Sequence, residues 1–271
     1  MPRFGSAQFA FPEFSGATRK LILWNLGIYF ALALLGVTSK PFELQLERWG
    51  ALLPPAVLHG WVWQLVTYSF IHAPSQILNT AFELLSLWFL GSFLESNHGP
   101  RWLAELYFVS VIGAALAAIG LYLAMPASVA LLAGCFGGIF GLLIAFGVIY
   151  ADMQFMMFPL PMMIKAKYLV AVYMLISLAM LFSTQRVFAF SQLGGALFGF
   201  LYIKFAPRGG FISGGSERYY GLRNEYYRWK RRRAAKKFQV YMRKQNRDVH
   251  FDKDGKYVDP DKDPKDRRWM N

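Results

Sequence analysis

The chain has 271 residues, of which 55% are hydrophobic and only 17% charged, a balance shifted from soluble globular domains toward membrane proteins. Its single cysteine, Cys135, excludes an internal disulfide and any metal cluster built on several cysteines. The net charge of +13 is concentrated at one end, because from Lys204 onward there are 20 Lys and Arg against 9 Asp and Glu, a net of +11.

Six apolar runs follow one another along the chain, and a membrane-spanning helix needs about 20 residues. The stretches between the first two runs and between the fourth and fifth are more polar and contain prolines, so we expect loops there, at residues 40–60 and 152–167. The pattern predicts an all-α polytopic membrane protein with a six-helix transmembrane domain over residues 21–206. The runs cover residues 21–38, 78–94, 102–123, 129–150, 168–182 and 188–205.

The positions of Lys and Arg indicate the orientation, because cytoplasmic segments are enriched in these residues. Arg19 and Lys20 precede the first run, and the basic tail follows the sixth. We therefore expect a cytoplasmic N-terminal segment, residues 1–20, and a basic cytoplasmic tail, residues 207–271. The absence of organelle signals favours a prokaryotic inner membrane.

Within the tail, residues 219–244 predict a basic amphipathic helix in which Tyr226, Tyr227 and Trp229 adjoin a run of Lys and Arg. Each Lys or Arg close to an anionic membrane surface contributes about 1 kcal/mol of binding. We expect this helix to bind anionic lipid or a cytoplasmic partner. Contact with nucleic acid is the weaker alternative, since no nucleic-acid-binding motif accompanies the charge.

Small residues recur four positions apart in the fourth run and again in the sixth. Glycine at this spacing opens a face on which the backbone of another helix can come close. We expect the fourth and sixth runs to form helices that pack tightly against each other. The packing glycines are Gly134, Gly137, Gly138, Gly141, Gly194, Gly195 and Gly199.

These two runs resemble the fourth and sixth transmembrane helices of the rhomboid family of intramembrane serine proteases. That family carries the motif G-x-S-G, with the nucleophilic serine third, and a base histidine just before L-G-G-A-L-F-G. Here Phe136 stands at the serine position and Gln192 at the histidine position. The resemblance covers roughly residues 61–205 and implies six helices around a small water-accessible cavity, with a degenerate catalytic dyad.

The second run contains what the resemblance identifies as the former oxyanion positions. The family has H-x-x-x-N there, and this chain has Asn79 and Glu83. An ionised carboxylate would repel a developing oxyanion. We expect Glu83 to hydrogen-bond to Asn79 or water in a small cavity, with client binding or proton handling as its functional alternative. We also expect Gln192 to hydrogen-bond within that cavity and Phe136 to fill the space of the lost dyad.

No intact catalytic residues remain, because cleavage needs a nucleophile and a base within hydrogen-bond reach. Phe136 has no nucleophilic atom, and Gln192 cannot take a proton near neutral pH. Cys135 is the one substitute nucleophile to consider, but we expect it to have no histidine partner and to act as a small buried hydrophobe. No cofactor and no metal site is indicated.

The resemblance therefore implies a rhomboid-like pseudoprotease without proteolytic activity, whose partners are membrane lipids and the transmembrane segments of client proteins. Two alternatives stay open. One is an intramembrane serine-type endopeptidase of the same family with a non-standard active site. The other is a transport or structural membrane role in which Glu83 and Gln192 line a polar path.

Overall fold

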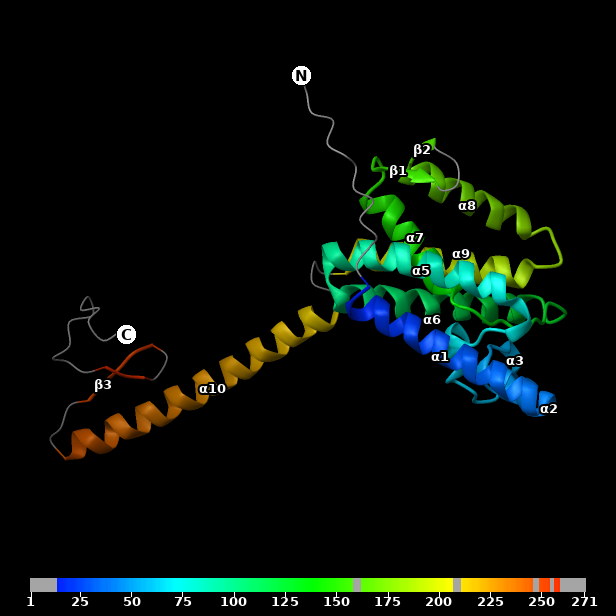
Figure 1. Ribbon diagram of the computed structural model, residues 1–271. Helices are drawn as coiled ribbons and strands as arrows, with labels where there is room; N and C mark the ends of the chain where they lie inside the picture. Colours follow the sequence, from blue (N-terminus) through cyan, green and yellow to red (C-terminus); the bar gives the residue numbers. More distant parts are fainter. Residues whose placement is uncertain (1–13, 158–161, 207–210, 246–248, 254–255, 259–271) are drawn as a thin grey trace, which may run out of the picture. The chain divides into compact units, whose positions relative to one another are not determined.

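The computed structural model describes residues 14–157, 162–206, 211–245, 249–253 and 256–258 (Figure 1). The chain forms two compact units, Met1–Gly210 and Phe211–Asn271. Both are mostly helical. The expected N-terminal segment, residues 1–20, lies largely outside the described residues.

The first unit is a bundle of helices with one β-hairpin, and the hairpin connects two of the helices (Figure 1). Each of the six apolar runs contains a helix, although the helix in the fourth run covers only part of it. In chain order the elements are α1 Gly16–Thr38, α2 Lys40–Gly50, α3 Pro54–Leu58, α4 Gln64–Thr67, the 3-10 turns η1 Tyr68–Phe70 and η2 Pro74–Gln76, α5 Ile77–His98, α6 Pro100–Ala124, α7 Phe136–Ile149, β1 Gln154–Met157, β2 Met162–Lys165, α8 Ala166–Met180 and α9 Arg186–Phe205.

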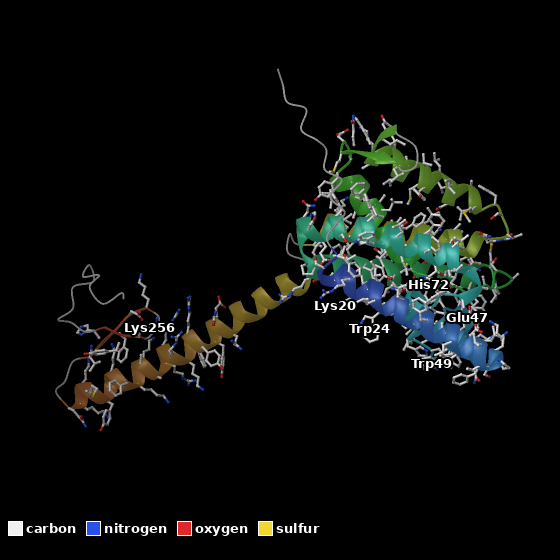
Figure 2. The ribbon with its side chains drawn as sticks, in the orientation of Figure 1. Lys20, Trp24, Glu47, Trp49, His72 and Lys256 are labelled. Carbon is white, nitrogen blue, oxygen red and sulfur yellow. The ribbon has the colours of Figure 1, made fainter. Side chains whose placement is uncertain are left out.

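Among the described residues, four helices are long and apolar enough to cross a membrane: α1, α5 together with η2, α6 and α9. The apolar helices α7 and α8 are shorter, with 14 and 15 residues. Many large apolar side chains point away from the protein, as Trp24 on α1 and Trp49 on α2 do in Figure 2, with 67% and 51% of their surface exposed. The structure supports the predicted all-helical membrane protein.

Helix α6 lies at the centre of the core and packs against both α7 and α9. One face of α6 is buried in the core, whereas Leu116 and Leu123 on another face are exposed. Its largest fully buried side chains within the main hydrophobic cluster are Leu103, Leu106, Tyr107 and Val111. The hydroxyl of Tyr68 donates a hydrogen bond of 2.8 Å to the carbonyl of Val111 and so fixes η1 to this helix.

The fourth apolar run is not one continuous helix, which corrects the expectation for residues 129–150. Its first part is extended: Leu132 and Leu52 exchange backbone hydrogen bonds of 2.8 and 2.9 Å. Gly134 has φ +108°, a conformation that glycine adopts at little cost and that does not continue a helix. Helix α7 begins only at Phe136. Hydropathy alone could not locate this break, because the extended part is as apolar as the helix.

Residues 40–60, expected as a loop, contain the helices α2 and α3. Gln64 holds them in place: its Oε1 accepts the N–H of Leu53 at 3.0 Å, and its Nε2 donates to the carbonyls of Arg48 and Trp49 at 3.1 and 3.3 Å. The second expected loop, residues 152–167, contains the β1–β2 hairpin. Next to it Asp152 accepts from Lys167 at 2.8 Å and from Lys165 at 3.4 Å, and these hydrogen bonds hold the pKa of Asp152 below its usual value.

The second unit contains helix α10, Phe211–Lys244, followed by a small hairpin of β3, His250–Phe251, and β4, Tyr257–Val258. The helix starts before the expected residue 219 and includes Gly214 and Gly215. The hairpin folds back on α10. Gln239 Nε2 donates to the carbonyl of Val249 at 3.2 Å, and the ring of Phe251 lies 6.2 Å from that of Phe238.

Candidate functional site

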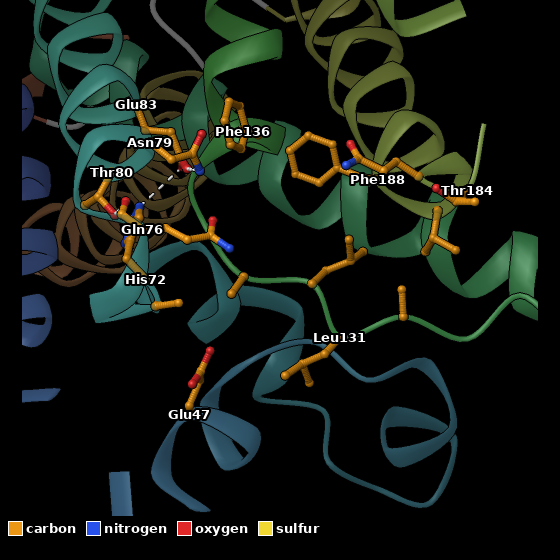
Figure 3. Close-up of a pocket in the computed structure, with 16 residues that line it drawn as sticks. Glu47, His72, Gln76, Asn79, Thr80, Glu83, Leu131, Phe136, Thr184 and Phe188 are labelled. Atoms are coloured by element: carbon orange, nitrogen blue, oxygen red, sulfur yellow. Dashed lines mark hydrogen bonds and ion pairs between the residues drawn. The ribbon is translucent and has the colours of Figure 1, made fainter. Parts of the chain in front are cut away.

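A cavity of about 480 Å³ opens beside the N-terminal ends of α5, α7 and α9 (Figure 3). One wall is polar and comes from η2, α5 and the loop before them, with His72, Gln76, Asn79, Thr80 and Glu83. The opposite wall is apolar and includes Leu131, Phe136 and Phe188. Three of the site residues expected from the sequence therefore line one cavity: Phe136, Asn79 and Glu83.

Phe136 is the first residue of α7, and its ring faces the cavity (Figure 3). It packs edge to face against Phe188 of α9, with ring centroids 4.9 Å apart and an interplanar angle of 81°. Phe188 was not among the site residues expected from the sequence. It lies four residues before Gln192, one helical turn away on the same side of α9, and this spacing could have indicated it.

Gln192 is not among the residues that line the cavity, which corrects the expectation that it would hydrogen-bond there. Its side chain is buried between helices, where Oε1 accepts a hydrogen bond of 2.8 Å from the hydroxyl of Ser177 on α8. The position that would hold a base histidine in the rhomboid family thus connects α9 to α8.

The Glu83 carboxylate is only 2% exposed, and both of its oxygens have partners. Oε1 accepts from Asn79 Nδ2 at 2.9 Å, one helical turn earlier on α5. Oε2 accepts the backbone N–H of Cys135 at 2.7 Å, immediately before α7 starts. A carboxylate at a helix N-terminus is stabilised by the helix dipole. Glu83 therefore joins α5 to the start of α7, and the side-chain amide of Asn79 donates one of its hydrogen bonds to this carboxylate.

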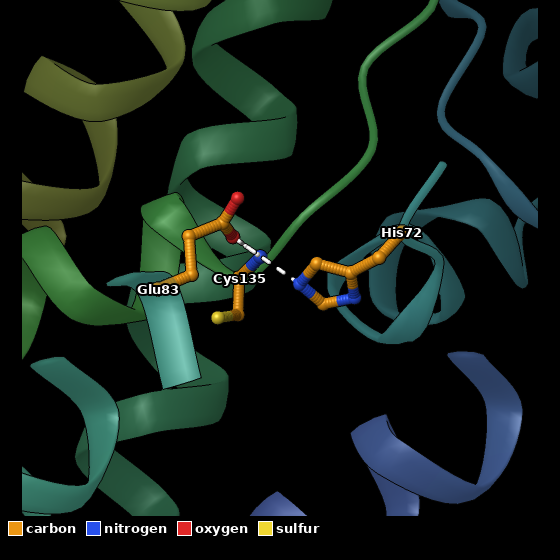
Figure 4. Close-up of side chains that lie close together, drawn as sticks. All are labelled: His72, Glu83 and Cys135. Atoms are coloured by element: carbon orange, nitrogen blue, oxygen red, sulfur yellow. Dashed lines mark hydrogen bonds and ion pairs between the residues drawn. The ribbon is translucent and has the colours of Figure 1, made fainter. Parts of the chain in front are cut away.

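A third partner of Glu83 is His72, whose Nε2 lies 3.3 Å from Oε2 (Figure 4). Possible metal-ligating atoms of His72, Glu83 and Cys135 all lie within 4.8 Å of one another. The sequence pattern did not indicate that His72 lies this close to Cys135, although no hydrogen bond joins the two side chains among the described contacts. His72 lies far away in sequence, in the turn between η1 and η2, and the path of the chain back to α7 brings the two residues together.

Cys135 itself is fully buried and does not line the cavity. It is the N-cap of α7 rather than a residue within a helix, because the preceding segment is extended. The Cys135 thiol therefore lies behind the cavity wall, whereas His72 and Glu83 are part of that wall.

The glycine faces of α7 and α9 meet at backbone distance. A Cβ added to Gly195 would lie 2.2 Å from the carbonyl oxygen of Gly137, and one added to Gly199 would lie 2.7 Å from the Cα of Gly141. Both distances are too short for any side chain, so these positions are restricted to glycine by space.

The remaining expected packing glycines have different neighbours. A Cβ on Gly138 would meet the Tyr107 ring at 2.3 Å, and one on Gly194 would meet the Cβ of Ala117, also at 2.3 Å, so both face α6. Gly134 lies outside the helix, and a Cβ there would be 2.7 Å from Glu83 Oε2. Gly134 is thus a turn residue against the Glu83 carboxylate and does not belong to the helix–helix face.

Glu47 of α2 adds a second carboxylate to the cavity, at its edge (Figure 3). Partial burial raises the pKa of Glu47, and the neighbouring Glu43 carboxylate raises it further, while Lys40 opposes the shift. The cavity therefore combines two acidic groups on one side with the Phe136–Phe188 pair on the other.

Residues 24–230 match the model of a family described as Eukaryotic integral membrane protein (DUF1751). No curated protein matches the chain. The match corrects the expected localisation: the family is eukaryotic, so the prediction of a prokaryotic inner membrane is wrong, whereas integral membrane location stands. The error came from treating missing organelle signals as informative, although apolar helices have the same composition in either kind of membrane.

Proposed function

The chain belongs to this family of eukaryotic integral membrane proteins, and we propose that it is a rhomboid-like pseudoprotease that binds transmembrane segments of client proteins without cutting them. The observation that carries the proposal is Phe136. Its ring lies in the cavity, against Phe188, at the position where the resemblance calls for a nucleophile. Neither ring offers a nucleophilic or basic atom.

The proposal includes six membrane crossings with both termini in the cytoplasm. Helix α7 alone reaches about 21 Å, short of the roughly 30 Å hydrocarbon core. The extended segment before it continues the path, and its non-helical backbone is tolerated at depth because Leu132, Gly134 and Cys135 are buried in protein. Protease protection of tags at both termini in sealed vesicles tests this topology, which predicts that both tags share one side.

Apolar faces on α5 and α8 are suited to receive a client helix. Both helices contact α7, yet they share little contact with each other. Phe82 on α5 and Leu175 on α8 expose 67% and 64% of their surface. Packing in a bilayer depends on close van der Waals contact more than on the hydrophobic effect. A transmembrane segment bound between α5 and α8 would gain such contact on two sides.

A cleavage assay tests the loss of activity. The purified chain and the double variant Phe136→Ser, Gln192→His are each reconstituted with a fluorescent transmembrane peptide that rhomboid proteases cut. We expect no cleavage by the unaltered chain. If the double change restores the dyad, only that variant should cleave the peptide, and serine-reactive inhibitors should block the cleavage. Cleavage by the unaltered chain would contradict the pseudoprotease assignment.

Photocrosslinking tests client binding independently. A photoreactive phenylalanine analogue replaces Phe82, Leu175 or, as control, Phe30 of α1, which is 64% exposed and so equally accessible to lipid. We expect saturable crosslinks to the same peptide from Phe82 and Leu175 that excess unlabelled peptide removes, and only weak, unsaturable crosslinks from Phe30. Equal crosslinking at all three positions would mean lipid-like contact and would refute a client site.

One observation favours a second candidate, an endopeptidase with Cys135 as nucleophile, because His72 and Glu83 lie next to the thiol. The full burial of Cys135 speaks against it, since a substrate carbonyl must reach the sulfur. The same cleavage assay decides: this candidate requires activity in the unaltered chain that disappears in Cys135→Ala.

A further inference from the structure

We propose that His72, Glu83 and Cys135 bind a divalent transition-metal ion of the zinc class. The site goes beyond the proposed function, since neither client binding nor the loss of the dyad requires it. Its three side chains come from separate parts of the chain: the turn between η1 and η2, the second turn of α5 and the residue before α7 (Figure 4).

The three ligand types fit this class of ion. Zinc is bound in proteins by imidazole nitrogen, thiolate sulfur and carboxylate oxygen. Hard ions such as magnesium and calcium prefer oxygen ligands alone, so the sulfur and nitrogen argue against them. All three residues are buried, with exposures of 3%, 2% and 0% in the order His72, Glu83, Cys135.

The spacing of the ligand atoms is close to what such an ion needs. Tetrahedral bonds of about 2.0–2.3 Å place neighbouring ligand atoms roughly 3.3–3.8 Å apart. His72 Nε2 and Glu83 Oε2 are 3.3 Å apart, and the whole set lies within 4.8 Å. The Cys135 sulfur would have to approach by about 1 Å, which a rotation of its side chain can supply.

Among the described residues, no Lys or Arg is paired with the buried carboxylate of Glu83. Its polar contacts are with the neutral amide of Asn79, the backbone N–H of Cys135 and Nε2 of His72. Buried charges in proteins are paired or coordinate metals. The other ring nitrogen of His72, Nδ1, is buried and has no hydrogen-bond partner among the described residues. A divalent ion held by Glu83 Oε2 and His72 Nε2 would supply the missing cation.

A fourth coordination position would face the cavity, because His72 and Glu83 line it whereas Cys135 lies behind. Water or a ligand atom from the cavity could occupy that position. On binding, the Cys135 thiol gives its proton to solvent and the resulting thiolate bonds to the ion, so metal uptake releases one proton and changes no oxidation state.

The test uses the full chain in detergent, treated with EDTA and then titrated with Co²⁺ as a spectroscopic substitute for Zn²⁺. We expect about one Co²⁺ per chain, a thiolate-to-cobalt charge-transfer band, and loss of that band when Zn²⁺ displaces the cobalt. Cys135→Ser should remove the band, and His72→Gln should weaken binding at least tenfold. His59→Gln is the control, because His59 also follows a short helix but is exposed and belongs to no such cluster.

Circular dichroism and size-exclusion profiles check that each variant is folded. If His72→Gln does not fold, Cys135→Ala decides the question through the charge-transfer band. Binding well below one ion per chain, or a folded Cys135→Ser variant that binds Co²⁺ as tightly as the unaltered chain, would overturn the proposal. Neither result depends on client binding, so the two proposals fail separately.

Discussion

Phe136 and Glu83 are the two cavity residues that differ most in chemistry from the catalytic and oxyanion residues of a rhomboid protease. At the first, an aromatic ring replaces any nucleophile and packs on Phe188. At the second, a carboxylate accepts the N–H of Cys135 and the amide of Asn79, so donors that might stabilise an oxyanion are already engaged. Both features support the proposal that this cavity binds a client segment and does not cleave peptides.

Glu47→Gln gives a pH-dependent prediction at the same scale. Because the pKa of Glu47 is raised in the folded state, its protonated form favours folding below the usual glutamate pKa, and this contribution is lost as pH rises through the raised value. Glu47→Gln should therefore raise the midpoint of thermal unfolding at neutral pH. At pH 4 the difference should shrink, and a larger difference at pH 4 than at pH 7 would contradict the assignment.

At the scale of elements, α7 and α9 pack closely because glycines at their contact carry no side chain. The α7–α9 contact places Gly195 against the backbone of Gly137. Gly138 and Gly194 instead pack against α6. Close backbone approach gives helices in a bilayer the van der Waals contact that holds them together. The cavity is positioned by this contact, because Phe136 and Phe188 begin the same two helices.

Gly195→Ala should therefore destabilise the protein, by about 1–3 kcal/mol, because overpacking forces the backbones apart. Gly120→Ala is the matched control. Gly120 lies within α6, and a Cβ there would meet nothing within 4 Å, so its replacement should be neutral or slightly stabilising. Thermal unfolding in detergent measures both. Similar shifts for the two variants would indicate a helix-propensity effect in place of the proposed contact.

Glu95→Ala should loosen the start of α1. The Glu95 carboxylate, at the far end of α5, accepts the backbone N–H groups of Ala17 and Thr18 at 2.7 and 2.8 Å. Ser15, the N-cap residue, makes no side-chain capping bond, so Glu95 replaces it from another helix. Loss of a cap costs about 0.5–2 kcal/mol.

Hydrogen exchange of the α1 amides measures this effect. Glu95→Gln, which keeps one acceptor oxygen, should retain part of the protection at Ala17 and Thr18. The exposed Asn97→Ala on the same helix end serves as control. Unchanged exchange in Glu95→Ala would show that water or another group caps α1 equally well.

At the scale of the whole molecule, the chain divides its chemistry between two units. The first, Met1–Gly210, holds the apolar core and the cavity, and the second, Phe211–Asn271, holds most of the positive charge. In α10 the aromatic rings are solvent-exposed beside the basic residues: Trp229 is 53% exposed and lies 5.3 Å from the Arg233 guanidinium. Exposed rings next to cations suit a lipid head-group surface.

Trypsin digestion of the full chain in nanodiscs tests this surface. Cleavage at Arg231–Arg233 should be several-fold slower with phosphatidylserine than with phosphatidylcholine alone, and 0.5 M salt should remove the difference by screening. The site after Lys256, outside α10 and next to acidic residues, should change little. Equal rates at Arg231–Arg233 in both lipids would assign the basic helix to a protein partner.

The sequence by itself determined where the long helices lie and where the charge lies. The length and composition of an apolar run are local properties, and helix formation in a membrane follows from them because every backbone group must be satisfied within the segment. The four-residue spacing of glycines likewise indicated which faces of α7 and α9 could approach, and the residue types at Phe136 and Gln192 already excluded an ordinary serine–histidine dyad.

Only the tertiary structure decided what those residues touch. The run from residue 129 was expected as helix, yet its first part pairs with Leu52 as an extended segment, because Gly134 turns the chain against Glu83. The same packing brings His72 to Cys135 and takes Gln192 out of the cavity to Ser177. Such contacts join residues far apart in sequence, and their free energy depends on geometry that no local pattern encodes.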